Sequence, residues 1–129
     1  MTTDKPILLV VDDEPELVEF ATLGAENVGY LVYSATNGQD FKQTFQSQNP
    51  SLILMDVAMP DIDGVELIEW LQGAGSQTPI VLMSGYGEKM LSWAQTLAAD
   101  MGIPVVATLN KPFTLEELQT ILSEAIPAT

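Results

Sequence analysis

Three acidic residues follow apolar runs that are typical of buried strands. Asp12 and Asp13 close the run of residues 6–11, and Asp56 closes the run of residues 52–55. If both runs are strands of one parallel sheet, these carboxylates meet at one edge and repel one another unless a cation or a proton is present. A fold gains little from such a placement, so it indicates a chemical role.

The residue types that the chain lacks restrict that role. There is no Cys and no His, which excludes disulfides, thiolate metal sites and mechanisms that need a nucleophilic Cys or a Ser–His pair. A metal site must therefore use oxygen ligands, which favours Mg²⁺, Ca²⁺ or Mn²⁺. A carboxylate beside such a cation can attack phosphorus and form an aspartyl phosphate.

Two later apolar runs end in residues that suit a phosphoryl group. Ser84 follows residues 80–83, and its hydroxyl is able to meet a phosphoryl oxygen. Lys111 follows the fifth run and supplies a point positive charge. The next residue, Pro112, biases Lys111 toward extended geometry and makes a cis peptide bond accessible.

The elements that must position these residues alternate in type along the chain. Short apolar runs and amphipathic stretches follow one another five times, the pattern of βα units around a parallel sheet. The predicted strands are residues 7–11, 30–35, 51–55, 79–83 and 105–109. The predicted helices are residues 15–28, 38–47, 64–73, 88–101 and 115–126. The mixed polarity of residues 30–35 suits an edge strand.

We therefore predict an α/β fold, a flavodoxin-like (βα)5 doubly wound sandwich with a parallel five-stranded sheet of order 2-1-3-4-5. The strand order reverses between the first and third strands, and ligands of such sheets bind beyond the carboxyl ends at that point. Asp12, Asp13 and Asp56 fall there. The expected organisation is a single domain over residues 1–129, with its core at about 6–126 and no output domain.

The charge balance and the lack of long apolar runs argue against binding to nucleic acid or to membranes. Eighteen acidic residues face four Lys and no Arg, which gives a net charge of −14. Such a field repels nucleic-acid phosphates and anionic lipid surfaces. No apolar run is long enough for a signal peptide or a membrane span. We expect a cytoplasmic protein that binds neither nucleic acid nor membranes.

Four motifs at the strand ends resemble, in order, those of the response-regulator receiver domain. They are Asp-Asp-Glu-Pro at 12–15, Asp56 with Met-Pro-Asp-Ile-Asp-Gly at 59–64, Met-Ser-Gly-Tyr at 83–86 and Lys-Pro-Phe-Thr at 111–114. The likeness runs from about residue 6 to 126. It implies a CheY-like receiver of a two-component phosphorelay, a phosphorylatable switch that signals in trans. Such a domain is not a general enzyme, because it catalyses only its own phosphorylation and dephosphorylation.

The resemblance implies a role for each matching position. Asp56 is the implied phosphoacceptor, and its donor is a phosphohistidine on a histidine kinase or a histidine phosphotransfer protein. Lys111 is implied to pair with the phosphoryl group and Ser84 to hydrogen-bond it. The implied ligands of Mg²⁺, or of Mn²⁺, are Asp12, Asp13, Asp56 and the main-chain carbonyl of Ala58.

The roles of two residues stay open, and two other functions are alternatives to a phosphorylatable receiver. Thr108 stands where receivers often carry an aromatic ring that turns inward on activation, so a switch that uses the ring is not expected. Glu14 is either near metal-bound water or a first-turn acid beside a helix dipole. The alternative functions are a degenerate receiver that acts only as a protein-interaction module, and an aspartyl-phosphate hydrolase, which needs a second catalytic acid.

Overall fold

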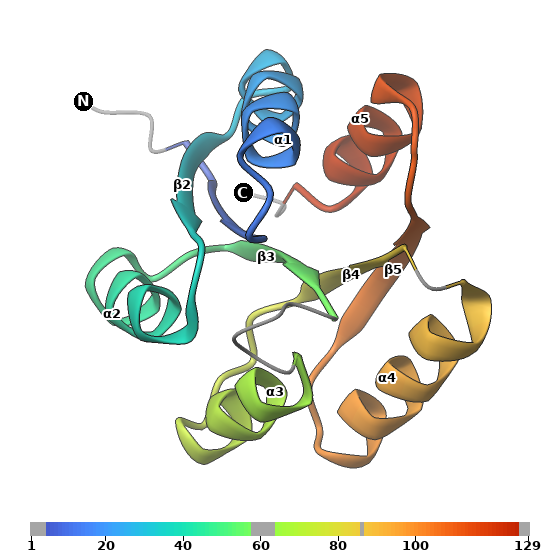
Figure 1. The fold of residues 1–129 in the computed structure, drawn as a ribbon. Helices are drawn as coiled ribbons and strands as arrows, with labels where there is room; N and C mark the ends of the chain where they lie inside the picture. Colours follow the sequence, from blue (N-terminus) through green and yellow to red (C-terminus); the bar gives the residue numbers. More distant parts are fainter. Residues whose placement is uncertain (1–4, 58–63, 86, 127–129) are drawn as a thin grey trace.

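All five predicted βα units are present in the computed structural model, which describes residues 5–57, 64–85 and 87–126. The strands are β1 (Ile7–Val11), β2 (Leu31–Ala35), β3 (Leu52–Asp56), β4 (Ile80–Ser84) and β5 (Val105–Asn110). The helices are α1 (Pro15–Asn27), α2 (Gly38–Gln48), α3 (Gly64–Gly73), α4 (Glu88–Asp100) and α5 (Leu115–Glu124). Each predicted boundary lies within two residues of the observed one (Figure 1).

The five strands form one parallel sheet in the order β2-β1-β3-β4-β5, which confirms the predicted topology. Helices α1 and α5 cover one face, and α2, α3 and α4 cover the other (Figure 1). The strand order reverses between β1 and β3. The carboxyl ends of those two strands are therefore the expected ligand-binding edge of the sheet.

Alternate residues of the central strands build two separate cores. In β1, Leu8 and Val10 pack in the core under α1 and α5, whereas Leu9 and Val11 pack in the core under the other three helices. Every residue of β3 and β4 is buried. This explains why these runs lack polar alternation. By contrast, β2 is largely exposed or half-buried and lies at an edge, as its mixed sequence predicted.

Three strands, β3, β4 and β5, run one residue further toward the site than the apolar runs indicated. Asp56 pairs with Met83 inside the sheet, and the N–H of Val57 donates to the Met83 carbonyl at 3.0 Å. Ser84 pairs with Asn110 in the same way. Asp56 and Ser84 are therefore the last residues of β3 and β4 rather than the first loop residues, because the ladder hydrogen bonds continue past the apolar side chains.

Local capping signals fix where α1 and α5 begin. The Thr114 side chain accepts a hydrogen bond from the Glu117 N–H at 3.0 Å, and the Glu117 side chain accepts from the Thr114 N–H at 2.9 Å. This capping box starts α5 three residues after Lys111, so that the helix begins close to the site. Pro15 occupies the first turn of α1 as expected. The described residues include no helix with the length and apolarity that crossing a membrane requires.

Tyr30 connects the end of α1 to α5. Its main-chain N–H donates to the Ala25 carbonyl at 3.1 Å, so it completes the helix end and β2 starts one residue later than predicted. The buried hydroxyl donates to the Leu122 carbonyl at 2.8 Å. That carbonyl lies in the last turn of α5, where helical carbonyls lack partners within the helix. The Tyr30 side chain thus provides a hydrogen-bond donor for one carbonyl at the end of a helix that lies 92 residues further along the chain.

Replacing Tyr30 with Phe is expected to lower the free energy of unfolding by about 1 kcal/mol at neutral pH, because one buried hydrogen bond is lost. Burial raises the pKa of Tyr30 from 10.0 to about 12. Folding therefore favours the protonated hydroxyl, and the stability of the parent protein falls as the pH rises from about 10 to about 12. Urea unfolding across this range should show a shallower fall for the Tyr30→Phe variant. Tyr33→Phe, at a half-buried position of β2, should keep the steeper fall; equal slopes for the parent and Tyr30→Phe would contradict this account.

Candidate functional site

The carboxyl ends of β1, β3 and β5 bring together side chains that are far apart in the sequence. Asp12 follows β1 and is fully buried, and its N–H donates to the Ala35 carbonyl of β2 at 3.2 Å. Asp56 ends β3 and is 4% exposed. Lys111 follows β5, and its N–H donates to the Ser84 carbonyl of β4 at 2.8 Å. The sheet itself therefore sets the spacing of the site.

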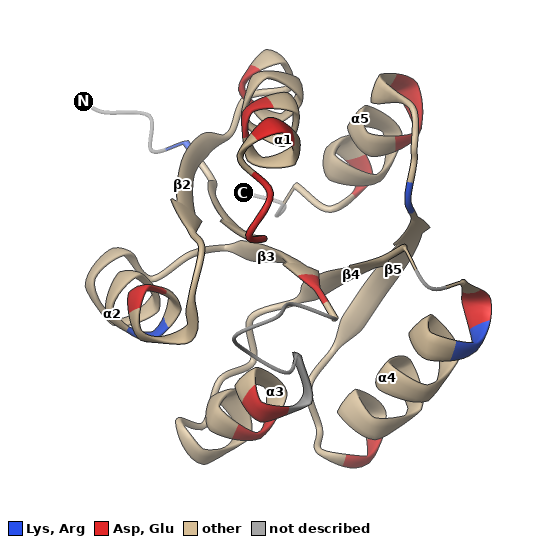
Figure 2. Cartoon of the chain, in the orientation of Figure 1, with Lys and Arg blue, Asp and Glu red and all other residues tan. Residues whose placement is uncertain are grey.

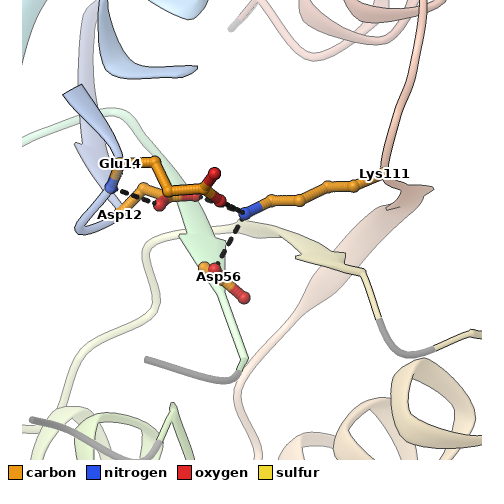
Figure 3. Close-up of polar contacts among 4 residues, drawn as sticks. All are labelled: Asp12, Glu14, Asp56 and Lys111. Carbon is orange, nitrogen blue, oxygen red and sulfur yellow. Dashed lines mark hydrogen bonds and ion pairs between the residues drawn. The ribbon is translucent and has the colours of Figure 1, made fainter. Parts of the chain in front are cut away.

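The Lys111 ammonium lies at the centre of an ion-pair cluster (Figure 3). Its Nζ donates to Asp12 Oδ2 at 2.7 Å and to Asp56 Oδ2 at 2.8 Å. A third carboxylate, Glu14 Oε1, accepts at 3.1 Å. The lysine side chain is 14% exposed, so these contacts are shielded from water much more than surface ion pairs are. The predicted grouping of Asp12, Asp56 and Lys111 is present.

The sequence left open whether Glu14 lies at the site, and it did not predict the contact of Glu14 with Lys111. Glu14 is the N-cap residue of α1, and its side chain makes no capping hydrogen bond. Its main-chain N–H donates to Asp12 Oδ1 at 2.9 Å, while its 63% exposed carboxylate turns to Lys111. The contact joins positions 97 residues apart, and no local pattern marks it.

Asp13 joins Asp12 and Asp56 in a group that is suited to a cation. One carboxylate oxygen from each residue lies within 4.8 Å of the others. These are the hard oxygen donors that Mg²⁺ prefers. Together with Glu14, the site holds four carboxylates and one ammonium, which gives a formal charge of −3. The donor set and the uncompensated charge both fit a divalent cation. Ala58, the fourth implied ligand, lies outside the described residues.

The pKa shifts reflect the conflict between burial and charge. Burial raises the pKa of Asp12 above its ordinary value, and the negative charge of Asp56 adds to this. Hydrogen bonds from Lys111 and from the Glu14 N–H act in the opposite direction without overcoming burial. Burial lowers the pKa of Lys111, but its hydrogen bonds to the carboxylates outweigh that effect and raise the pKa above its ordinary value. The lysine therefore stays charged across the physiological range.

The remaining predicted residues lie on β4 and β5. Ser84 is fully buried at the end of β4, next to the strand end that carries Asp56. The Lys111–Pro112 peptide bond is cis. Thr108 is half-buried in β5 and lines an open groove between β5 and α5. Figure 2 shows acidic positions at the ends of β1 and β3 and a basic position after β5.

Solved structures of other proteins share this fold. A response regulator from Thermotoga maritima, known from its crystal structure, superimposes with a TM-score of 0.81, at 22% identity, over 97% of this chain and 100% of that one. At this identity the likeness shows the fold: a CheY-like, doubly wound receiver architecture.

Residues 8–123 match the family described as the response regulator receiver domain. The chain belongs to this family. It is therefore a receiver domain of two-component signal transduction, a class that is generally not made up of classical enzymes.

Relatives with the same domain include both regulators and a kinase. The alkaline phosphatase synthesis transcriptional regulatory protein PhoP of Bacillus subtilis is 30% identical over 111 residues, 86% of this chain and 44% of that protein. The autoinducer 1 sensor kinase/phosphatase LuxN of Vibrio harveyi is 30% identical over 123 residues, 95% of this chain and 14% of that protein. The chain thus spans less than half the length of these curated relatives.

Proposed function

We propose that this receiver domain accepts a phosphoryl group on Asp56 from a phosphohistidine of a histidine kinase or histidine phosphotransfer protein, in a Mg²⁺-dependent reaction. The observation that carries the proposal is the placement of Asp56. Its Oδ2 lies 2.8 Å from the Lys111 ammonium, and carboxylate oxygens of Asp12 and Asp13 lie within 4.8 Å of an oxygen of Asp56. A nucleophile, a fixed cation and metal-type ligands thus share one strand-end site. Those are the parts that phosphoryl transfer requires.

The residues divide the work of transfer. An oxygen of Asp56 forms a bond to phosphorus while the phosphorus–nitrogen bond to the donor imidazole breaks, and the imidazole leaves with that electron pair. Lys111 neutralises phosphoryl oxygens, and the Ser84 hydroxyl donates a hydrogen bond to one of them. A divalent cation held by Asp12, Asp13, Asp56 and the Ala58 carbonyl supplies the remaining charge neutralisation when it is bound.

Phosphorylation then changes the populations of two conformations, as in other switches that act through local charge. The switched domain signals by binding a separate protein partner in trans. We also propose that the domain is cytoplasmic. The single-domain organisation over residues 1–129 stays a prediction. The expectation that the domain avoids nucleic acid rests on the net charge of −14 and also stays a prediction.

Incubation with acetyl phosphate and Mg²⁺ is expected to add one phosphoryl group to the protein, as measured by intact-protein mass spectrometry. Chelation of divalent cations should prevent this gain, and Mn²⁺ should restore it. A degenerate receiver would show no gain under any of these conditions. A hydrolase would instead release phosphate from p-nitrophenyl phosphate over many turnovers. Either outcome would replace the proposed function.

A further inference from the structure

The proposed reaction leaves the carboxylate of Glu14 without a role. Glu14 Oε1 accepts a hydrogen bond from the Lys111 ammonium at 3.1 Å. The main-chain N–H of Glu14 donates to Asp12 Oδ1 at 2.9 Å, so its backbone orients Asp12 whatever the side chain does. The side chain makes no capping hydrogen bond, although Glu14 is the N-cap residue of α1. A structural role at the helix start therefore does not explain the carboxylate.

The contact with Glu14 is not needed to hold Lys111 in place. Asp12 and Asp56 accept from the same ammonium at 2.7 Å and 2.8 Å, and both distances are shorter than the 3.1 Å to Glu14. Both aspartates are also shielded from water, whereas the Glu14 side chain is 63% exposed. Exposed ion pairs add little to stability. The main effect of Glu14 at the site is therefore its negative charge.

That charge lies on the side of Lys111 that faces solvent. Of the carboxylates that contact Lys111 in the described part of the chain, only that of Glu14 is mostly exposed. Figure 3 shows the Glu14 and Asp12 carboxylates turned toward the lysine Nζ. A phosphoryl group has to enter from solvent, and its oxygens need the same ammonium. The Glu14 carboxylate and the phosphoryl group are therefore competitors for one cation.

We infer that Glu14 competes with the incoming phosphoryl group for Lys111 and makes the site selective among phosphodonors, an inference that rests on the proposed function. A donor that carries only negative charge has to displace the Glu14 carboxylate and approach it against repulsion. A donor with a positive N–H group beside phosphorus can pair that group with Glu14 while the phosphoryl oxygens take Lys111. Glu14 thus favours phosphorus–nitrogen donors over acyl phosphates.

Two small donors represent these two classes. Acetyl phosphate has no positive group, and its transfer breaks a phosphorus–oxygen bond, so that acetate leaves with the electron pair. Phosphoramidate is protonated on nitrogen at neutral pH, and its transfer breaks the phosphorus–nitrogen bond, so that ammonia leaves with the electron pair. In both reactions an oxygen of Asp56 forms the new bond to phosphorus, as in the proposed function.

Glu14→Gln removes the charge and keeps the side-chain length and the main-chain N–H. Labelling followed by intact-protein mass spectrometry is expected to become about threefold to fivefold faster with acetyl phosphate, and less than about twofold faster with phosphoramidate, as suits an exposed charge. Each protein is saturated with Mg²⁺, because loss of a carboxylate also weakens attraction of the cation. Glu16→Gln makes the same charge change at an exposed position in the first turn of α1 and should leave both rates unchanged.

A binding measurement separates failure of this inference from failure of the proposed function. With Asp56→Asn in both proteins and Mg²⁺ present, Glu14→Gln should bind inorganic phosphate about threefold more tightly, as read from the ¹⁵Nζ resonance of Lys111. Tighter phosphate binding without any labelling of the parent protein would contradict the proposed function and support the competition.

Four results would each overturn the inference: equal acceleration by Glu16→Gln, equal gains with the two donors, slower labelling of Glu14→Gln, or an unchanged phosphate affinity. Slower labelling at saturating Mg²⁺ would in addition assign the Glu14 carboxylate to the bound cation.

Discussion

Replacement of Asp56 by Asn is expected to abolish labelling by acetyl phosphate and to leave the fold intact. The amide is nearly the same size as the carboxylate, and its oxygen can still accept from Lys111, which lies 2.8 Å from Asp56 in the parent protein. It lacks the anionic oxygen that attacks phosphorus. The substitution also changes the formal charge of the acidic cluster from −3 to −2, so the free energy of unfolding should be unchanged or higher.

Asp100→Asn provides the control for this loss, since it makes the same chemical change at an exposed position at the end of α4. Its mass gain with acetyl phosphate and Mg²⁺ should equal that of the parent protein. Proteolytic mapping should place the phosphoryl group on the peptide that contains Asp56. Undiminished labelling of Asp56→Asn would remove Asp56 from its proposed role.

Much of the fold could be predicted because the physical signals are local. Two-sided burial makes β3 and β4 continuously apolar, and the mixed residues of β2 mark an exposed edge. Capping residues such as Thr114 mark helix starts. The errors at the ends of β3 and β4 lie where hydrogen bonding, which leaves no hydrophobic pattern, extends the strand. Asp56 and Ser84 are polar, so the apolar runs stopped before them, yet both belong to the sheet ladder.

The site was predictable to the extent that the topology gathers it. Asp12, Asp13 and Asp56 needed only the parallel order of the strands to meet. The contact between Glu14 and Lys111 depends on two side-chain conformations across 97 residues, and no spacing rule encodes those. The open groove between β5 and α5 was also not predictable from the sequence, because it depends on how α5 packs beside the strand.

Replacement of Lys111 by Met is expected to lower the free energy of unfolding by about 3–5 kcal/mol in the absence of divalent cations, the usual cost of removing one partner of a buried ion pair. Met keeps the long apolar stem and deletes the charge. Asp12 is fully buried and the Asp56 side chain is 6% exposed, so water cannot compensate for the missing ammonium. Lys89→Met, at an exposed position of α4, should cost little by comparison.

The response to Mg²⁺ distinguishes lost charge compensation from lost packing. Without Lys111 the formal charge of the four carboxylates is −4, so a divalent cation should stabilise Lys111→Met more than the parent protein in urea unfolding. Adding Asp12→Asn to the variant should recover part of the loss, because the two residues interact directly at 2.7 Å. If neither the cation nor the second substitution reduces the cost, the carboxylates do not require the lysine as their counter-charge.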